Sequence, residues 1–193
     1  GETFACALPL SGLYNVYNAA AAFAGARALG IAPKVAVQAL ARVSAAFGRQ
    51  ERVMVAGRDV RLLLCKNPAG TNQALSTVLA DPDPLYLLVA LNDGIQDGRD
   101  VSWIWDVDFE RLAGRVARAV ATGSRAADMG LRLKYAGLGD QLVVEASPER
   151  ALDRAIAGTP PAGRLFVLPT YTAMMSLRET IASRGGRGSF WQQ

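Results

Sequence analysis

Apolar residues recur at helical spacing near the start of the chain. Residues 13–29 are rich in alanine and carry apolar side chains on one side, and Gly30 supplies a stop signal, so we predict a helix there. Pro33 opens a second apolar-periodic stretch that we expect to remain helical to about Phe47. Gly48 would end this helix.

The pattern then switches to alternating residues typical of strands. Residues 52–55 and 60–65 flank Gly57, which predicts a hairpin whose second strand is buried on both sides. The switch indicates a domain boundary between residues 47 and 51. We therefore expect a first unit over 1–48, a second over 49–184, and a flexible or partner-bound tail over 185–193.

Short apolar strands and helices alternate through the rest of the chain. The expected strands are 85–91, 101–107, 115–121, 142–145 and 165–168, and the expected helices are 71–79, 125–136, 147–157 and 170–183, with a loop over 92–100. Such alternation predicts an α/β fold with a mostly parallel, doubly wound sheet. Sites in such folds form at the carboxyl ends of the strands.

Composition narrows the possible chemistry. The 193 residues are 51% hydrophobic and 20% charged, which suits a globular fold with a sizeable core. Cys6 and Cys65 form no CxxC pair, and there is no histidine, so a zinc ribbon, an HExxH site and a histidine general base are excluded within this chain. No lysine follows a glycine, so no GxxxxGK[ST] phosphate loop is present. Catalysis would therefore use carboxylates, Lys66, Lys134 or groups from another chain.

Charge and hydropathy exclude further classes. The chain has 21 basic and 17 acidic residues, but the basic ones are scattered and no aromatic residues interleave with them, so we expect no nucleic-acid partner. The longest apolar run, 85–91, is much shorter than the roughly 20 residues that a membrane span needs, so we expect no transmembrane segment. The start inside an apolar segment, without methionine, suggests a fragment of a larger protein. The two cysteines, which form no CxxC pair, suggest a reducing compartment, and we expect a cytoplasmic protein.

One candidate site follows the buried strand that ends near Cys65. The segment Lys66-Asn67-Pro68-Ala69-Gly70-Thr71-Asn72 places a lysine and two amides where α/β folds do chemistry. We take Lys66, Asn67 and Asn72 as candidate substrate or interface residues. The alternative is an ordinary turn, with Thr71 as the helix N-cap.

A second candidate is an acidic region that holds seven of the eleven aspartates within 28 residues: Asp81, Asp83, Asp93, Asp97, Asp100, Asp106 and Asp108. Within it, residues 101–108 read Val-Ser-Trp-Ile-Trp-Asp-Val-Asp. If this stretch is extended, both tryptophans point to one side and Asp106 and Asp108 to the other. Carboxylates alone, without a second ligand type at fixed spacing, do not predict a metal site. The alternative is that the tryptophans are core and Asp106 is a cap.

Polar residues near the first helix and the boundary are also candidates. Asn15 and Asn18 lie three apart on a predominantly apolar helix, which suggests ligand contact, although a polar stripe is the alternative. Arg49 lies in Gly48-Arg49-Gln50-Glu51, which could equally be a helix stop followed by a solvated ion pair.

Several segments resemble a known family. Gly12-Leu13-Tyr14-Asn15-Val16-Tyr17-Asn18-Ala19-Ala20 and Phe47-Gly48-Arg49-Gln50-Glu51 resemble the end of the central domain of Mur ligases and the hinge to their C-terminal domain. Lys66–Gln73 and Leu91–Asp106, with its Ser-Trp-Ile-Trp-Asp sequence, resemble the MurT family, the ligase-like subunits of lipid II isoglutaminyl synthase. The resemblance implies a Mur ligase C-terminal domain over 49–184 and a remnant of the central ATPase domain over 1–48.

The resemblance implies a two-subunit amidotransferase in peptidoglycan synthesis. A glutaminase subunit, GatD, would release ammonia from glutamine with a cysteine and a histidine. The complete ligase-like subunit would use ATP and Mg²⁺ to activate the D-glutamate of lipid II, which ammonia converts to D-isoglutamine at the inner face of the membrane. Asp106 would complete the glutaminase triad, with Asp100 and Asp108 as fallback positions.

The same resemblance implies further roles and a limit. Asn15 and Asn18 would contact the adenine of ATP, Arg49 would be the hinge arginine, and Asp93 would meet substrate or partner. Lys66 replaces the acidic residue that usually starts the Mur motif here, and we infer that it contacts a substrate phosphate or carboxylate. Because the phosphate loop and the family's zinc ribbon are absent, this chain alone should not amidate lipid II. Two alternatives are a noncatalytic α/β interaction module, whose acidic loop docks a basic partner, and the C-terminal domain of another Mur-type or folylpolyglutamate ligase.

Overall fold

The chain divides into two compact units. A computed structural model describes residues 2–10, 12–43, 49–185 and 187–188, with the backbone alone at 49, 50, 187 and 188. Contacts cluster residues 1–46 into a first unit and residues 47–193 into a second. In the described part of the chain, no helix is both long and apolar enough to cross a bilayer.

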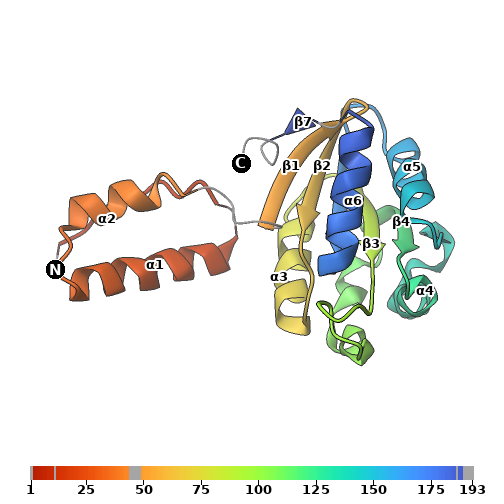
Figure 1. Cartoon of the computed structure of the whole chain (residues 1–193), viewed down its shortest axis with the longest axis horizontal. Helices are drawn as coiled ribbons and strands as arrows, with labels where there is room; N and C mark the ends of the chain where they lie inside the picture. The colour runs from red at the N-terminus through yellow and green to blue at the C-terminus, as the bar shows by residue number, and fades with distance from the viewer. Residues whose placement is uncertain (1, 11, 44–48, 186, 189–193) are drawn as a thin grey trace. The chain divides into compact units, whose positions relative to one another are not determined.

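The first unit is a pair of helices, α1 (Leu13–Ala28) and α2 (Pro33–Leu40), which Figure 1 shows with the chain preceding them. Helix α1 confirms the prediction to within a residue. Helix α2 is shorter than predicted, because the amides of Arg42 and Val43 donate to the carbonyls of Ala39 and Leu40 in tight i→i−3 turns that end the regular helix. The predicted stop at Gly48 lies outside the described residues.

Little of the first unit is buried. Helix α1 has no buried residue, and Ala36 alone is buried in α2. An apolar groove of about 510 Å³ runs between the two helices and the preceding segment, with Phe4, Val16, Phe23 and Leu40 in its walls. The rings of Phe4 and Phe23 are 5.9 Å apart. This unit therefore presents apolar side chains that its own helices do not cover.

The second unit is built on a seven-stranded sheet in the order β5-β4-β3-β6-β2-β1-β7. The strands are β1 (Arg49–Val55), β2 (Arg58–Leu63), β3 (Leu85–Ala90), β4 (Val116–Thr122), β5 (Leu142–Val144), β6 (Arg164–Pro169) and β7 (Arg187–Gly188). Strands β2 to β6 are parallel, whereas β1 pairs antiparallel with β2 and β7. Ala56 and Gly57 both have positive φ in the β1–β2 turn, as a tight hairpin requires, so the predicted hairpin is confirmed.

Helices cover both faces of the sheet, which confirms the predicted doubly wound architecture (Figure 1). One face carries α3 (Pro68–Leu79), α4 (Ala126–Leu133) and the short 3₁₀ helices η1 (Ser102–Asp106) and η2 (Phe109–Leu112). The other face carries α5 (Pro148–Gly158) and α6 (Tyr171–Ser183). A one-turn π helix, η3 (Lys134–Leu138), and η4 (Gly139–Gln141) lead from α4 to β5.

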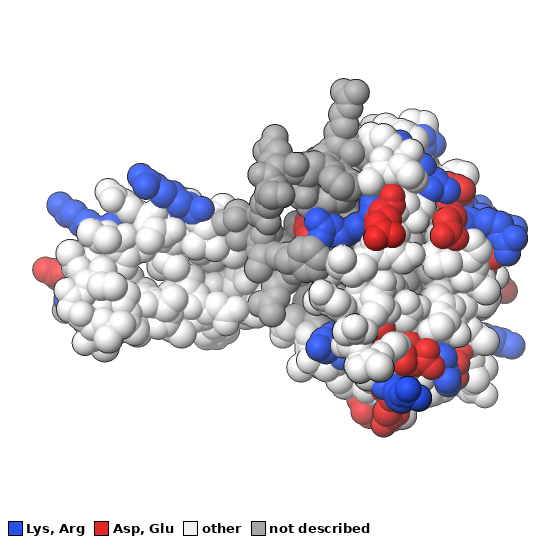
Figure 2. Space-filling view, viewed as in Figure 1, with Lys and Arg blue, Asp and Glu red and all other residues white. Residues whose placement is uncertain are grey.

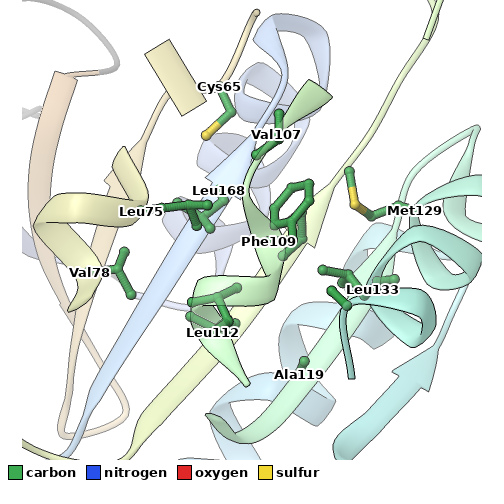
Figure 3. Close-up of a cluster of buried hydrophobic side chains, with 14 of the residues drawn as sticks. Cys65, Leu75, Val78, Val107, Phe109, Leu112, Ala119, Met129, Leu133 and Leu168 are labelled. Atoms are coloured by element: carbon green, nitrogen blue, oxygen red, sulfur yellow. The ribbon is translucent and has the colours of Figure 1, made fainter. Parts of the chain in front are cut away.

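The core under η1 and η2 fixes the segment that contains Asp106 and Asp108. Figure 3 shows Val107 and Phe109 pointing into this core, between Leu168 of β6 and Met129 of α4. Both side chains are about 1% exposed. Burying a large apolar side chain stabilises a fold by roughly 1.5–3 kcal/mol, so these two residues hold the segment against the sheet.

The prediction of an extended stretch over 101–107 is wrong. The amide of Ile104 donates to the carbonyl of Val101 at 3.2 Å, and residues 102–106 form η1. Ile104 is 1% exposed, whereas Trp105, a candidate for the core in the sequence analysis, is 50% exposed. The physical reason is local capping, because the Asp100 carboxylate accepts from the amide of Ser102 at 2.8 Å and so starts a turn.

The start of α3 also differs from the alternative considered above. Asn67, not Thr71, is the N-cap: its side chain accepts from the amide of Gly70 at 2.8 Å, and Pro68 takes the first helical position. The Thr71 hydroxyl lies inside the first turn and donates to the Asn67 carbonyl at 2.8 Å. The two-residue strand β7 lies in the predicted tail, and residues 189–193 are outside the described residues.

Candidate functional site

The carboxyl ends of the central parallel strands meet at one edge of the sheet, as expected for a doubly wound fold. We call this the carboxyl edge and define it as residues 64–67 after β2, 91–97 after β3, 123–125 after β4 and 170–172 after β6. Two strands that are neighbours in space, β3 and β6, are far apart in sequence, so the edge joins distant segments.

Asn92 connects three of these segments. Its backbone amide donates to the Thr170 hydroxyl at 3.0 Å, and its side-chain nitrogen donates to the Thr172 hydroxyl at 2.9 Å. Its side-chain oxygen accepts from the amide of Ser124 at 2.9 Å. One amide side chain therefore ties the loop after β3 to the loops after β4 and β6.

Asp93 is placed by the loop after β4. Its carboxylate accepts from the Ser124 hydroxyl at 2.8 Å and lies 3.5 Å from the Arg125 guanidinium. The hydroxyl bond and then the arginine lower the pKa of Asp93 below its ordinary value. Arg125 also pairs with Asp128 at 2.8 Å, so the cation is shared between two carboxylates. Asp93 is thus held ionised at the edge.

Asp97 anchors the far end of the same loop. Only 7% of Asp97 is exposed, and its carboxylate accepts from both the backbone amide of Thr172, at 2.8 Å, and the Thr172 hydroxyl. Since Thr172 lies in the first turn of α6, Asp97 satisfies an amide that the helix itself leaves unpaired. The loop is therefore fixed at Asn92, Asp93 and Asp97.

Gly123 allows the loops after β3 and β4 to touch. Its φ is +102°, and a Cβ atom there would lie 2.4 Å from the Leu91 carbonyl oxygen and 2.6 Å from the Asn92 side-chain oxygen. Both the backbone conformation and the space require glycine.

The Asp106 segment, residues 100–110, leaves this edge and crosses the core face as η1 and η2. Asp106 and Asp108 are exposed, and neither carboxylate forms a hydrogen bond or ion pair within the described part of the chain. The amide of Asp108 donates to the Asn72 side-chain oxygen at 2.9 Å, which ties the segment to α3. The bond from the Ser102 amide lowers the pKa of Asp100.

A polar cavity and an exposed aromatic pair border the segment. The cavity has a volume of about 330 Å³ and is lined by Arg99, Asp100, Val101, Ser102, Ile104, Trp105, Arg125 and Asp128. The Trp105 ring packs edge-on against Tyr135, with centroids 5.8 Å apart. On the face of the second unit shown in Figure 2, acidic and basic side chains are interspersed and form no field of one sign. The surface near Asp106 thus combines apolar and mixed-charge groups.

Lys66 lies at the carboxyl edge beside β6. It follows Cys65, whose amide donates to the Pro169 carbonyl at 2.8 Å, and the Lys66 side chain is exposed. Asn67 uses its side chain as the α3 cap, so this oxygen is already engaged. Burial raises the pKa of the Cys65 thiol to about 12, which keeps it protonated and unreactive.

The remaining candidates belong elsewhere. On α1, Asn15 is partly exposed and Asn18 is exposed, and the two lie on one side of the helix. Arg49 is the first residue of β1, and its side chain lies outside the described part. Within the residues described, no group of three or more cysteine or carboxylate side chains could hold a metal ion. Of the sequence candidates, the structure places Asp93 and Asp97 together in the loops of the carboxyl edge. It places Asn72 beside the Asp106 segment.

The residues that hold this edge together were not among the sequence candidates. Ser124, Thr170 and Thr172 form its central hydrogen bonds, and Arg132 of α4 contacts the Asp106 segment. Ser124 and Thr170 each lie within two residues of the end of a predicted or observed strand, which is the position where sites form in this fold.

Comparison with known families decides the classification. A family model for the MurT ligase C-terminal domain matches residues 64–174, which include the Asp106 segment and the whole carboxyl edge. The chain belongs to the MurT family. The resemblance predicted from the sequence is thereby confirmed.

A curated MurT relative extends the match. The subunit MurT of lipid II isoglutaminyl synthase (glutamine-hydrolyzing) from Streptococcus pneumoniae is 37% identical over 178 residues, which cover 92% of this chain and 40% of that protein. The chain thus spans about 40% of the length of this relative.

Solved structures support the fold. MurF from Acinetobacter baumannii superposes with a TM-score of 0.67 at 22% identity, over 90% of this chain and 39% of that one. Folylpolyglutamate synthase from Mycobacterium tuberculosis, solved with ADP and AMPPCP, gives a TM-score of 0.65 at 21% identity, over 94% of this chain and 42% of that one. This chain therefore has the α/β fold of a Mur ligase C-terminal domain, as predicted.

Proposed function

We propose that this chain is the C-terminal part of the MurT subunit of an ATP-dependent amidotransferase that converts the D-glutamate of lipid II to D-isoglutamine. The family assignment supports this, and so does the name of the Streptococcus pneumoniae relative, which is a subunit of a glutamine-hydrolysing lipid II isoglutaminyl synthase. Residues 1–48 would belong to the central ATPase domain of the intact protein and 49–184 to its C-terminal domain.

The proposed reaction divides between two subunits. A glutaminase partner, GatD, would hydrolyse glutamine to glutamate and ammonia with a cysteine nucleophile and a histidine base. In the complete MurT subunit the D-glutamate carboxyl of lipid II would be phosphorylated from ATP, releasing ADP, and ammonia would then displace phosphate to form the amide. A chain without histidine is compatible with this division, because the base would come from the partner.

The observation that carries the proposal for this chain is the state of Asp106. Its carboxylate is exposed and has no partner among the described residues, yet its neighbours on both sides are packed or hydrogen-bonded. Such a carboxylate is available to accept from an imidazole of the partner and to stabilise the imidazolium that forms during catalysis. The Asp108 carboxylate is equally exposed and unpaired among the described residues, whereas Asp100 already accepts from Ser102. Both remain fallback positions, because the family resemblance matches the triad aspartate to Asp106.

ATP and Mg²⁺ are proposed for the intact protein. The described residues do not fit a site for the metal and the phosphates, since they contain no cluster of ligands for a cation and the sequence has no GxxxxGK[ST] loop. Asn15 and Asn18 would contact the adenine, and Arg49 would act at the hinge. Lys66, Asn67, Asn72 and Asp93 would meet substrate or partner. Because its substrate would be lipid II, the complex would act at the cytoplasmic face of the membrane.

The test is glutamine hydrolysis by the complete protein paired with its glutaminase. Asp106→Asn should lower hydrolysis by about 10³- to 10⁴-fold without dissociating the complex, because the amide no longer stabilises the imidazolium. Asp83→Asn is the matched control: it is also an exposed aspartate, but it lies before β3 at the opposite end of the strands. It should leave hydrolysis unchanged.

Two outcomes would contradict the triad role. Full hydrolysis by Asp106→Asn would remove Asp106 from the mechanism, and Asp100→Asn and Asp108→Asn would be tested next. Loss of the complex together with hydrolysis would favour a noncatalytic docking module, for which the exposed pair of Trp105 and Tyr135 is the supporting observation.

A further inference from the structure

Arg132 is the one buried cation among the lysines and arginines that the structure describes. It lies near the end of α4, and its side chain is 3% exposed. Burying a guanidinium is costly unless its donors are satisfied. All of its described partners lie in a single stretch of the chain, the Asp106 segment.

Two backbone contacts lie on either side of Asp106. The Nε atom of Arg132 donates to the carbonyl of Ile104 at 3.0 Å, and Nη2 donates to the carbonyl of Val107 at 2.6 Å. These carbonyls precede and follow Asp106 in the sequence. The guanidinium therefore holds the backbone on both sides of the aspartate without touching its carboxylate.

Three side chains complete the environment of Arg132. Glu110 pairs with Nη1 at 2.8 Å and with Nη2 at 2.9 Å. The guanidinium carbon lies 5.4 Å from the ring centre of Trp105 and 5.3 Å from that of Phe109, within cation–π range. One planar group thus contacts five of the seven residues from 104 to 110.

The segment needs such support because η1 is a five-residue 3₁₀ helix. Hydrogen bonds in these helices are poorly aligned, and the Val107 amide reaches the Ile104 carbonyl only at 3.4 Å. Helix α4, by contrast, is fixed in the core through Met129 and Leu133, which Figure 3 shows packed beside Phe109. Arg132 therefore links a weakly bonded turn to a rigid helix.

We propose that Arg132 is a positioning residue that fixes the Asp106 carboxylate for the imidazole of the partner glutaminase. This rests on the function proposed above for Asp106. A group that orients a catalytic base must be held within about 0.5 Å, and a displacement of about 1 Å lowers a rate by as much as about 100-fold. The planar fork of arginine matches two carbonyls and a carboxylate at once, and lysine offers no such fork.

The experiment compares variants of the complete protein at saturating concentrations of the glutaminase. Arg132→Lys keeps the charge and removes the fork. It should lower kcat for glutamine hydrolysis by about 10- to 100-fold and leave KM for glutamine within about twofold, since glutamine binds in the partner. Arg111→Met is the matched control, because Arg111 lies just beyond this segment, is exposed and donates to the Ser76 hydroxyl instead. It should keep the wild-type kcat.

A double variant separates positioning from general packing. If Arg132 acts through Asp106, then Arg132→Lys combined with Asp106→Asn should be no slower than Asp106→Asn alone. Glu110→Gln serves as a second variant in case Arg132→Lys fails to fold. Glu110 is largely exposed, and removing its charge leaves both carbonyl contacts of Arg132 in place. This variant should give a smaller loss of kcat in the same direction.

Three results would overturn the positioning role. The first is wild-type kcat in both Arg132→Lys and Glu110→Gln while Asp106→Asn is inactive, which would leave the proposed triad standing. The second is a rate for Arg132→Lys that reaches the wild-type value once the glutaminase is titrated to saturation of the variant, which would assign Arg132 to docking alone. The third is wild-type hydrolysis by Asp106→Asn, which would overturn the triad and the positioning role together.

Discussion

The two ends of the parallel strands use charge in opposite ways. At the amino end, which we define by Asp59, Asp81, Arg52, Arg61 and Arg164, the charged groups pair with one another. At the carboxyl edge, hydroxyls and the Asn92 amide bond to one another, and Asp97 accepts from the backbone amide and hydroxyl of Thr172 rather than from an arginine. Nearby Lys66 and Asp106 have no partner among the described residues.

Asp59 and Asp81 show how closed the amino end is. Asp59 is bound by Arg52 at 2.7 Å, Arg61 at 3.1 Å and Arg164 at 3.4 Å, and Arg164 also pairs with Asp81. Only 4% of the Asp81 side chain is exposed. Charges that are satisfied in this way stabilise the fold and have little left to offer a ligand.

The difference separates groups that hold the sheet from groups that can act on something else. At the carboxyl edge the loops are held by hydroxyls, amides and the carboxylates of Asp93 and Asp97, while Lys66 and Asp106 nearby have no partner among the described residues. Substitutions at either end of the strands should therefore lower the free energy of unfolding. We expect only substitutions near the Asp106 segment to lower the proposed glutamine hydrolysis as well. All three tryptophans lie in the second unit, so tryptophan fluorescence reports its unfolding.

The largest loss is expected from Gly123→Ala at the carboxyl edge. The new Cβ would lie 2.4 Å from the Leu91 carbonyl oxygen in a backbone conformation that alanine disfavours. Overpacking and backbone strain together should lower the free energy of unfolding by about 3–4 kcal/mol in a urea titration.

Gly98→Ala is the matched control for this prediction. Gly98 has a similar φ of +93° but nothing within 4 Å of its Cβ position. Backbone strain alone should lower the free energy of unfolding by about 1 kcal/mol. Equal losses in the two variants would mean that the close approach of the loops contributes nothing.

A smaller loss is expected from Asp81→Asn at the amino end. The substitution keeps the shape but leaves the Arg164 guanidinium with Asp59 as its remaining partner. Breaking a pair that is buried on one side should lower the free energy of unfolding by about 2 kcal/mol.

Asp153→Asn is the comparison, because Asp153 pairs with Arg184 at 2.6 Å on the surface and is 54% exposed. A surface pair contributes about 0.5 kcal/mol or less, so this variant should unfold almost as the wild type does. A loss for Asp81→Asn as small as that for Asp153→Asn would show that the amino-end network is not stabilising.

Asp97→Asn should have a smaller effect, again at the carboxyl edge. The two bonds from Thr172 use the two different oxygens of the Asp97 carboxylate, and asparagine replaces one of these oxygens with an NH2 group that cannot accept. The loss of one hydrogen bond should lower the free energy of unfolding by about 1 kcal/mol. Hydrogen exchange at the start of α6 should rise in the variant, and unchanged exchange there would contradict the capping role.

The smallest effect is an acid dependence at the amino end. Burial raises the pKa of Asp59, but hydrogen bonds and charge from Arg52 and Arg61 outweigh burial and hold it below the ordinary value of 3.8. Because the unfolded chain then binds the proton more tightly, this stability is present above about pH 4 and is lost as pH falls through the folded pKa.

Unfolding at pH 7 and pH 3 tests this sign. Asp59→Asn should be less stable than the wild type at pH 7, by about 1 kcal/mol or less, and closer to it at pH 3. A difference between the two proteins that stays the same at both pH values would show that Asp59 does not link stability to protonation.

The order of elements could be predicted from the sequence because each has its own local signal. Pro148 opens α5 after the Ser147 cap, and the positive-φ turn at Gly57 joins β1 to β2. Local signals gave the wrong structure for the Asp106 segment, because its alternation of apolar and polar residues is typical of a strand. Its conformation depends on Asp100 and on Arg132, which comes 28 residues after Ile104 in the sequence.

The carboxyl edge was predictable in place but not in detail. Asp93 was a candidate through the acidic region and the family resemblance, and it lies just after a buried strand, where the rule about strand ends places sites without three-dimensional information. Its neighbours could not be chosen, because Thr170 and Thr172 reach Asn92 only once β6 lies next to β3, and they are about 80 residues away in the sequence. Arg132 is one of 18 arginines, and nothing local distinguishes it.

The position of β6 also has a consequence for the order in which the chain can fold. The β1–β2 hairpin and the β3–β4–β5 group share no pairing, because β6 lies between them and bonds to both β2 and β3. During synthesis β6 is thus made after both of its neighbours, β2 and β3. The two halves of the sheet cannot join until residues 164–169 have been synthesised. Pairing between segments so distant in sequence is slow. We therefore expect the insertion of β6 to limit the rate at which the complete sheet forms.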